Sequence, residues 1–574
     1  MAAIGGTQGG GMTLGNRLAI WRAGFGKPAS GFVSQPEPRS IGLYARGKQL
    51  VAGNFLFAGH LVEAPGQSIW DIAPPDPTFA AEVHGFGWLD DLAAVSDAPA
   101  RKRAQEWTYG WIAATPQGTG AGWTPDLTGR RLIRWINHAP FLLVGRPQAD
   151  SAAYFTSATR QVRYLARAWT KAQPGLPRFE ALTGLIVAGL ALEGMQSLTR
   201  PALAAMAQDC RQEIDAGGGI PTRNPEDLLE VFTLLNWARL ALTEAEAAIP
   251  AEIPAAMERM APTLRALRHA DGGLARFHGG GRGLEGRLDT ALAMSGVRGA
   301  PGPGLAMGFA RLASGRTTVI VDCAPPPGGR AGQSAHASTL GFELTSGRRP
   351  LIVNCGSGTP FGAEWRRAGR ATASHSTLAL EGFSSSRFGR GTQDILTDRA
   401  SILGVTQAQD NAGLHVSAAH GGWSVTHGLT HGRVLSLDIA GRRLTGTDLL
   451  EARTPAENRV LAPLLAKGAG IPFAVRLHLH PDVDAQLDMG GTAVSMALKS
   501  GEIWVFRHDG RCELTLQSSV YLEKGRLQPR ATKQIVLSGL VTVLQTRIGW
   551  TLAKAQDTPL AIRDLDREDL PVPV

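Results

Sequence analysis

The sequence predicts a multidomain protein in which an α-helical region precedes an antiparallel β-sandwich. Apolar residues recur at three- and four-residue intervals from about residue 90 to residue 268, which is typical of helices. From about residue 305 the pattern changes to short β-like runs separated by turns. A chain of 574 residues is also too long for one hydrophobic core. Helices followed by strands indicate two separate domains and not a βαβ sheet.

We divide the chain into an irregular N-terminal extension (1–60), a helical domain (61–290) and a β-sandwich domain (300–574). The extension mixes Gly, Pro and short apolar runs. The helical domain should contain helices that are separated by glycine-bearing turns, at 154–172, 178–196, 225–242 and 253–269. Antiparallel helices joined by short loops suggest a bundle, a solenoid or a helical toroid. In the sandwich we expect strands at 317–321, 339–344, 351–353, 376–380, 434–437 and 503–507.

The charge of the chain favours an anionic partner. The net charge is +9 and the pI is about 9.7, which suits nucleic acid, anionic lipid or acidic polysaccharide. Blocks of five or more Lys/Arg and nucleic-acid-binding modules are absent, so we expect no nucleic acid partner. There is no apolar stretch of 18 residues, so we expect no membrane span, and we see no secretory signal. The sequence carries no signal for an oligomeric state.

Four segments place polar side chains among apolar or glycine-rich neighbours. They are residues 135–141, with the pair Asn137-His138; 217–227, where Asn224 should cap a helix that begins at Pro225; 332–338, with His336; and 370–377, with His375. Each His or Asn could equally be a buried structural residue that bonds to the backbone. No HExxH, P-loop or GxSxG motif occurs, so common hydrolase and nucleotide-binding signatures are missing.

The order of these segments resembles the heparinase II/III-like family. The runs SAHASTLGFELTSGRRPLIVNCG and RATASHSTLAL look like the core of that family's β domain. The resemblance covers residue 131 to the C-terminus and is best over 335–380. It implies an (α/α) toroid followed by an antiparallel β-sandwich. It also implies a lyase that cleaves uronic-acid polymers such as heparan sulfate or alginate.

Cleavage by β-elimination makes specific chemical demands. A base must remove the proton α to the uronate carboxylate, while an amide or cation neutralises that carboxylate and an acid protonates the leaving oxygen. The resemblance implies that Asn137 is the neutraliser and that His138 and His336 transfer protons. It further implies that acidic substrate is bound by Arg223, Asn224, Asp227 and Arg370.

The chain departs from the family pattern at several of these positions. Asp227 stands where the family has a tyrosine, and Ser334 stands where it has a first histidine. Asp227 could act as a base only if burial raised its pKa. The implied ligands of a structural zinc ion are His336, His375 and Asn354, and an asparagine is a poorer ligand than the usual aspartate.

Two functions are therefore expected. One is a polysaccharide lyase that acts in the cleft between the domains. The alternative is a noncatalytic polysaccharide-binding relative in envelope or exopolysaccharide metabolism. The lyase requires residues from the toroid and from the sandwich to meet around one sugar ring. The resemblance implies the cell envelope or periplasm, and the lack of a signal peptide leaves the cytoplasm as the alternative location.

Overall fold

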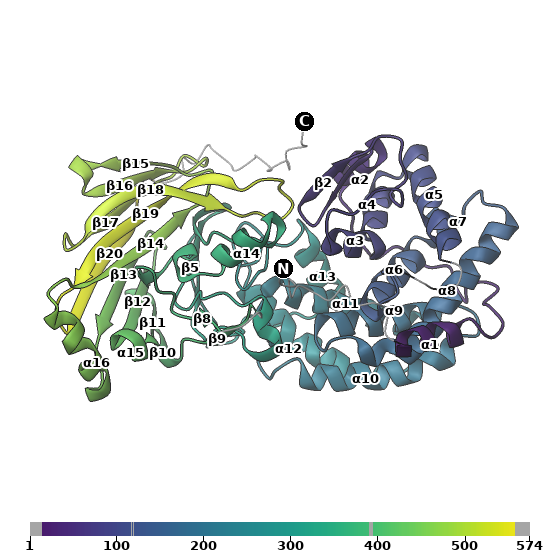
Figure 1. Cartoon of the computed structure of the whole chain (residues 1–574), viewed down its shortest axis with the longest axis horizontal. Coiled ribbons are helices and arrows are strands. Elements are labelled where there is room, and N and C mark those ends of the chain that lie inside the picture. The colour runs from purple at the N-terminus through teal and green to yellow at the C-terminus, as the bar shows by residue number, and fades with distance from the viewer. Residues whose placement is uncertain (1–13, 116–117, 119, 390–393, 557–574) are drawn as a thin grey trace.

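The computed structural model describes residues 14–115, 118, 120–389 and 394–556 (Figure 1). Helices dominate the first part of the chain and antiparallel strands the second, which confirms the predicted fold class. One apolar core runs through residues 19–320, and a second core occupies residues 310–552. Within the described residues, the search for a helix long and apolar enough to cross a membrane finds none.

The helical part is larger than the sequence pattern suggested. Its helices are α1 (Leu14–Ala23), α2 (Tyr44–Ala52), α3 (Pro77–His84), α4 (Gly87–Val95), α5 (Ala98–Ala114), α6 (Pro125–Asn137), α7 (Ala139–Leu143), α8 (Gln148–Ala168), α9 (Leu176–Ala191), α10 (Thr199–Gln212), α11 (Pro225–Glu244), α12 (Glu252–Ala266) and α13 (Arg287–Ser295). The four predicted helices match α8, α9, α11 and α12. The expectation of an irregular segment over 1–60 was wrong, because α1, α2 and the hairpin of β1 (Asn54–Phe57) and β2 (His60–Glu63) lie there.

Aromatic side chains fill the centre of the helical part around one buried cation. The Trp88, Trp107, Trp111, Trp123 and Trp135 rings are almost fully buried, and each contributes about 2–3 kcal/mol by leaving water. The Arg131 guanidinium lies 4.1 Å from the Trp111 ring centroid. Its hydrogen bonds go to the side chains of Gln161 and Thr128 and to two backbone carbonyls. Burial lowers the pKa of Arg131 to about 9.

The β part consists of two antiparallel layers. One eight-stranded sheet has the order β10 (Ile402–Gln409), β11 (Gly413–Trp423), β12 (Leu429–Asp438), β13 (Arg443–Glu451), β20 (Gln545–Gln556), β17 (Ile503–His508), β16 (Ala493–Ala497) and β15 (Asp484–Asp488). The other has the order β18 (Glu513–Tyr521), β19 (Arg530–Val541), β14 (Ile471–Leu479), β6 (Arg349–Val353), β5 (Phe342–Ser346), β4 (Thr317–Asp322) and β3 (Phe309–Ser314), with β7 (Leu378–Leu380) beside β14.

Short elements connect or cover these sheets. They are β8 (Arg387–Phe388), β9 (Leu396–Asp398), α14 (Ala363–Gly369), α15 (Ser424–His427), α16 (Pro455–Ala466), and the 3₁₀ turns η3 (Gly329–Gln333) and η5 (Thr372–Ser374). The strands include all six that the sequence predicted, with ends that differ by a few residues. The predicted strands at 339–344 and 376–380 begin later, because Thr339 and Leu340 form a turn and Ser376 and Thr377 lie in a bend.

A buried ionic network joins the two sheets close to His375. The Arg433 guanidinium on β12 donates to both carboxylate oxygens of Asp448 at 2.7 and 3.1 Å, and His431 binds the same carboxylate at 2.8 Å. Arg433 also donates to the carbonyl oxygens of Leu340 and Ser376 in the opposite layer. The position of the backbone next to His375 is therefore set by a bidentate ion pair in the sandwich core.

Candidate functional site

Three histidines meet where the helical part joins the β part. His336 follows η3, His375 follows η5, and His278 lies between α12 and α13. Nδ1 of His336 is 3.1 Å from Nε2 of His375, and the backbone N–H of His336 donates to Nδ1 of His278 at 3.2 Å. All three rings are buried. The structure thus brings together the predicted residues His336 and His375 and adds His278, which the sequence analysis missed.

The hydrogen bonds determine where the ring protons of His375 and His336 lie. Nδ1 of His375 is 2.8 Å from the carbonyl oxygen of Ala371, and because a carbonyl only accepts, this nitrogen carries the proton. Nε2 of a neutral His375 therefore accepts from Nδ1–H of His336. The remaining Nε2 of His336 then bears a lone pair, and it has no hydrogen-bond partner among the described residues.

The surroundings keep these rings uncharged. Burial lowers the pKa of His336 well below its usual value, and His375, His278, Arg370 and Arg366 lower that pKa further. Burial also lowers the pKa of His375 to about 4. His336 is therefore neutral at physiological pH and can accept a proton at Nε2, although a low pKa makes it a weak base.

Asp322, at the end of β4, is the anionic centre of this cluster. Its carboxylate accepts from Oγ of Ser338 at 2.7 Å and from Nη2 of Arg223 at 2.5 Å. It also faces Nε2 of His278 at 3.5 Å. A neutral His278 carries its proton on Nε2, since Nδ1 already accepts from the His336 backbone. No motif in the sequence singles out Asp322 or His278.

Arg223 was predicted to bind acidic substrate, but in the structure its guanidinium is bonded to other parts of the protein. Each of its three guanidinium nitrogens donates within the protein, to Asp322 and to the backbone carbonyls of Met307, Gly308 and Pro325. The guanidinium also stacks on Phe309 with 4.6 Å from Cζ to the ring centroid. Arg223 therefore fastens the start of α11 to the β part, and its donors are already used.

Arg370, the second predicted substrate-binding arginine, is likewise occupied. Its nitrogens donate to the carbonyl oxygens of Ala335 (2.7 Å), Asp394 (2.7 Å) and Gly332 (3.1 Å). The side chain is buried and stacks on Phe388. Since Gly332 and Ala335 lie in the loop that carries His336, Arg370 positions this loop and does not present its charge to solvent.

Asn224 and Asp227 lie at the start of α11. The Oδ1 atom of Asn224 accepts from the backbone N–H groups of Glu226 and Asp227, which confirms the predicted helix cap. Asp227 is half-buried, and burial raises its pKa to about 6, with Glu226 adding to the rise and Lys524 opposing it. Glu226 itself pairs with Lys524 at 2.5 Å across the junction between the helical and β parts. The condition for Asp227 to act as a base, a raised pKa, is met in part.

Asn137 and His138 lie elsewhere, at the end of α6. Nε2 of His138 is 2.9 Å from Oδ1 of Asp90 and 3.2 Å from Oγ of Ser40. Asn137 is 2% exposed, and its amide nitrogen has no partner among the described residues. Burial acts to raise the pKa of Asp90, but Arg134, His138 and Ser40 together lower it below its usual value.

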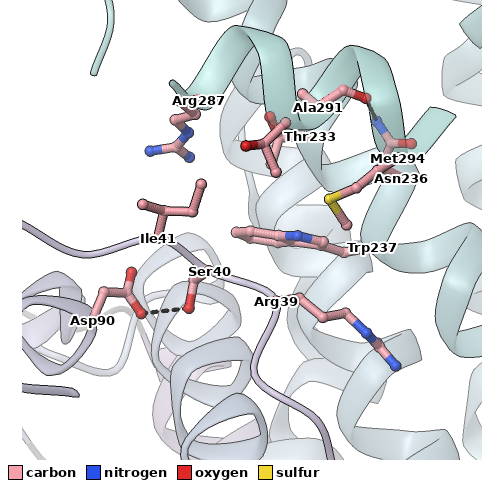
Figure 2. A pocket seen from close by; sticks show the side chains of 11 residues that line it. Arg39, Ser40, Ile41, Asp90, Thr233, Asn236, Trp237, Arg287, Ala291 and Met294 are labelled. Atoms are coloured by element: carbon pink, nitrogen blue, oxygen red, sulfur yellow. Dashed lines mark hydrogen bonds between the residues drawn. The ribbon is translucent and has the colours of Figure 1, made fainter. Parts of the chain in front are cut away.

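Ser40 and Asp90 line a pocket of the helical part, and Figure 2 shows their hydrogen bond beside the Trp237 ring. The other lining residues are Arg39, Ile41, Thr233, Asn236, Arg287, Thr290, Ala291 and Met294. Trp237 lies twelve residues after Pro225 in α11, so at 1.5 Å per residue it is about 18 Å along the helix from the end where Arg223 meets His278. No described hydrogen bond joins Asn137 or His138 to His336 or His375, so their expected meeting around one sugar ring stays a prediction.

Comparison with known proteins decides the family. The family model described as "Heparinase II/III-like, C-terminal" matches residues 298–551. The chain is 30% identical to FtsZ-localized protein C of Caulobacter vibrioides over 530 residues. This alignment covers 89% of this chain and 88% of that protein. The chain belongs to the heparinase II/III-like family. The resemblance inferred from the SAHASTLGF and RATASHSTLAL runs is thus confirmed.

Solved structures show the same architecture for this heparinase II/III-like protein. The crystal structure of heparinase III aligns with a TM-score of 0.67 at 12% identity, over 94% of this chain and 89% of that one. Heparan sulfate lyase HepC from Pedobacter heparinus, in a mutant form, aligns with a TM-score of 0.57 at 14% identity, over 95% and 88%. At such low identity these matches establish the fold of a toroid plus β-sandwich and nothing about the reaction.

The heparinase II/III-like pattern would place a tyrosine at 227, where this chain has Asp227. Among the described residues near the histidine cluster, Tyr521 is the candidate for the role of that tyrosine. Tyr521, at the end of β18, lies under the Arg276 guanidinium at 4.1 Å from Cζ to the ring centroid. Arg276 in turn donates to the carbonyl oxygen of Asn354 at 2.6 Å. Burial raises the pKa of Tyr521 to about 12, so it is protonated. No spacing or motif in the sequence points to this residue.

The residues implied as zinc ligands meet the requirements of the metal only in part. His336 and His375 present two nitrogens 3.1 Å apart. The third, Asn354, uses Oδ1 to accept from the backbone N–H of Ser376 and directs its amide nitrogen toward Glu343. In the described part of the chain no group of three or more His, Cys, Asp or Glu side chains could hold a metal ion. A structural zinc ion stays a prediction.

Proposed function

We propose that this heparinase II/III-like protein binds an acidic, uronate-containing polysaccharide and does not cleave it efficiently. One observation carries the proposal: the amide implied as carboxylate neutraliser, Asn137, lies in a different cluster from His336. β-Elimination gains its rate from a neutraliser, a base and an acid that act on one sugar ring in fixed geometry. Groups that belong to separate clusters, with no described hydrogen bond between them, lack that arrangement.

Binding of an acidic glycan is supported by the charge near the histidine cluster and by the family. The net charge of +9 favours a polyanion. The positive charges of Arg366 and Arg370 act on the His336 ring, because both lower its pKa. A uronate carboxylate that approached this nitrogen would be attracted, and its negative charge would raise the pKa of His336 toward its usual value.

A lyase remains the second candidate, because one observation favours it. Nε2 of His336 carries an unused lone pair in a neutral ring, which is the form a general base needs. In that case His336 takes the proton α to the carboxylate, the glycosidic C–O bond breaks, and the leaving oxygen needs a proton from an acid such as the neutral Tyr521.

The test mixes the purified protein with heparan sulfate, alginate and polygalacturonate. Binding is measured by calorimetry, and cleavage by the ultraviolet absorbance of the unsaturated uronate product. We expect binding to at least one polymer and no rise in absorbance. A rise that the His336→Ala variant abolishes would establish the lyase instead. Absence of binding to the whole panel would contradict both functions.

The relative's name also suggests a location for this chain. It is called FtsZ-localized, and the match spans most of both chains. We propose that this chain, too, is found with FtsZ, which favours the cytoplasmic alternative over the periplasm. The fluorescence of a fusion protein should overlap with that of labelled FtsZ in dividing cells. An even distribution of the fusion, unrelated to the position of FtsZ, would overturn this proposal.

A further inference from the structure

Helix α1 and the turn after it expose a row of large apolar side chains to solvent. Leu18, Trp21 and Phe25 are 46%, 62% and 59% exposed, and their spacing of three and four residues places them on one side of the helix and of the turn that follows it. Trp21 and Phe25 contact each other edge to face, with ring centroids 4.6 Å apart. We call these three residues the aromatic ridge. A ridge of this size is unusual on a surface that faces only water.

The opposite side of α1 holds the helix in place. Ala19, Ile20 and Ala23 are buried in the core of the helical part, and α1 packs along α8. Figure 1 shows α1 on the helical part, away from the β-sandwich. Because one side of α1 already supplies its contacts with the protein, the aromatic ridge is not needed for folding and is free to meet a partner.

The surroundings of the ridge are mainly basic, with Glu193 as an acidic residue that accepts a hydrogen bond from the neighbouring Ser30. Residues 14–35 and 151–172 include seven Lys or Arg and no Asp or Glu, whereas the whole chain has 58 basic and 49 acidic residues. The seven are Arg17, Arg22, Lys27, Arg160, Arg163, Arg167 and Lys171. Among the described residues none of these seven forms an ion pair with a carboxylate.

The loop that carries Phe25 is fastened within this basic region. Arg163 of α8 donates to the carbonyl oxygens of Gly26 at 3.1 Å and Lys27 at 2.6 Å. Burial lowers the pKa of Arg163, and the like charge of Arg167 lowers it further. Crowding cations without an acidic partner costs free energy, and a bound anion would relieve that cost.

We propose that the aromatic ridge and its seven basic neighbours dock on the surface of an anionic lipid membrane. Trp and Phe side chains favour the boundary between headgroups and acyl chains, and each Lys or Arg adds electrostatic attraction to anionic headgroups. A soluble acidic polymer would match the charge but would leave Leu18, Trp21 and Phe25 in water. The proposal goes beyond the glycan-binding function, from which it is independent.

The experiment is co-sedimentation of the full chain with vesicles made of phosphatidylglycerol and phosphatidylcholine in equal parts, and with vesicles of phosphatidylcholine alone. We expect binding to the anionic vesicles only, and release at high salt. The variant W21S/F25S should bind at least about tenfold more weakly, because it removes the inserted side chains. R17E/R22E should lose about tenfold or more as well, because it reverses two attractive charges.

Matched control variants change residues of the same kind in the β part. V425S/I439S replaces two apolar residues that are 86% and 67% exposed, and R459E/K467E reverses two exposed charges on α16. Both controls should bind like the unaltered protein, and circular dichroism should show that all variants fold. The proposal is overturned if the unaltered protein does not bind anionic vesicles, or if W21S/F25S binds them equally well. It is also overturned if the ridge instead mediates a dimer that W21S/F25S dissociates.

Discussion

At the scale of single residues, the arginines of this protein act mainly as internal supports. Arg223 and Arg370 each use all three guanidinium nitrogens on oxygens of the protein, and Arg131 is enclosed among tryptophans. The planar fork of arginine can hold several carbonyls at fixed angles, which an ammonium group cannot. Such roles are invisible in the sequence, where an arginine near a histidine looks equally suited to bind substrate.

Asp227 provides a prediction on pH dependence. Its pKa is raised from 3.8 to about 6 in the folded protein. Above pH 6 the folded state therefore carries a destabilised carboxylate, whereas below pH 4 both folded and unfolded states are protonated and the cost disappears. Asp227→Asn should stabilise the helical part by about 1–2 kcal/mol at pH 7.5, and this gain should shrink as the pH falls toward 4.

Urea unfolding followed by tryptophan fluorescence checks this prediction, because nine of the 13 tryptophans precede residue 290. The exposed Glu258 on α12 serves as control, and its replacement by Gln should change the free energy of unfolding little at either pH. A gain for Asp227→Asn that grows as the pH falls would contradict the assignment.

At the scale of elements, the loop between η3 and β5 depends on Arg370. The Arg370→Lys variant replaces a three-way donor by a point charge, so it should release at least one of the carbonyls of Gly332, Ala335 and Asp394. We expect amide hydrogen exchange over residues 329–338 to become roughly tenfold faster. Arg367→Lys is the matched control, because Arg367 is exposed and its guanidinium pairs with the Asp394 side chain and stacks on Phe388 without bonding to the loop. Equal exchange in the two variants would show that Arg370 does not hold the loop.

Most elements could be predicted from local sequence, and their exceptions have physical reasons. The helix predicted at 225–242 agrees closely with α11, because a capping side chain at Asn224 and Pro225 mark its start. The segment before residue 60 misled the prediction, since α1 is apolar on two sides and shows no simple periodicity. Tertiary packing against α8, and not local preference, stabilises α1.

At the scale of the whole molecule, the candidate site could be predicted only in part. His336 and His375 were each expected at the entrance of a strand, and the resemblance implied that they meet as ligands of one zinc ion. His278, Asp322 and Tyr521 reach the same region from distant segments, and only the folded chain shows this. Asn137 was assigned to the site by resemblance, but α6 places it near Asp90.

The molecule as a whole combines a helical part with an aromatic ridge and a β-sandwich joined to it through ion pairs. Arg223 with Asp322, which is buried, and Lys524 with Glu226, which is partly exposed, connect the two parts. Breaking a buried pair by removing one partner is costly, so the Arg223–Asp322 pair favours a fixed relation between α11 and β4. In this arrangement the cluster around His336 does not depend on the pocket beside Trp237.

The most direct measurement is a crystal structure of the protein with a bound uronate oligosaccharide. We predict that any sugar ring within contact of Nε2 of His336 has its carboxylate near Arg366 and makes no contact with Asn137. A single ring that touches both His336 and the Asn137 amide would contradict the separation of the two clusters, and with it the proposal of binding without efficient cleavage.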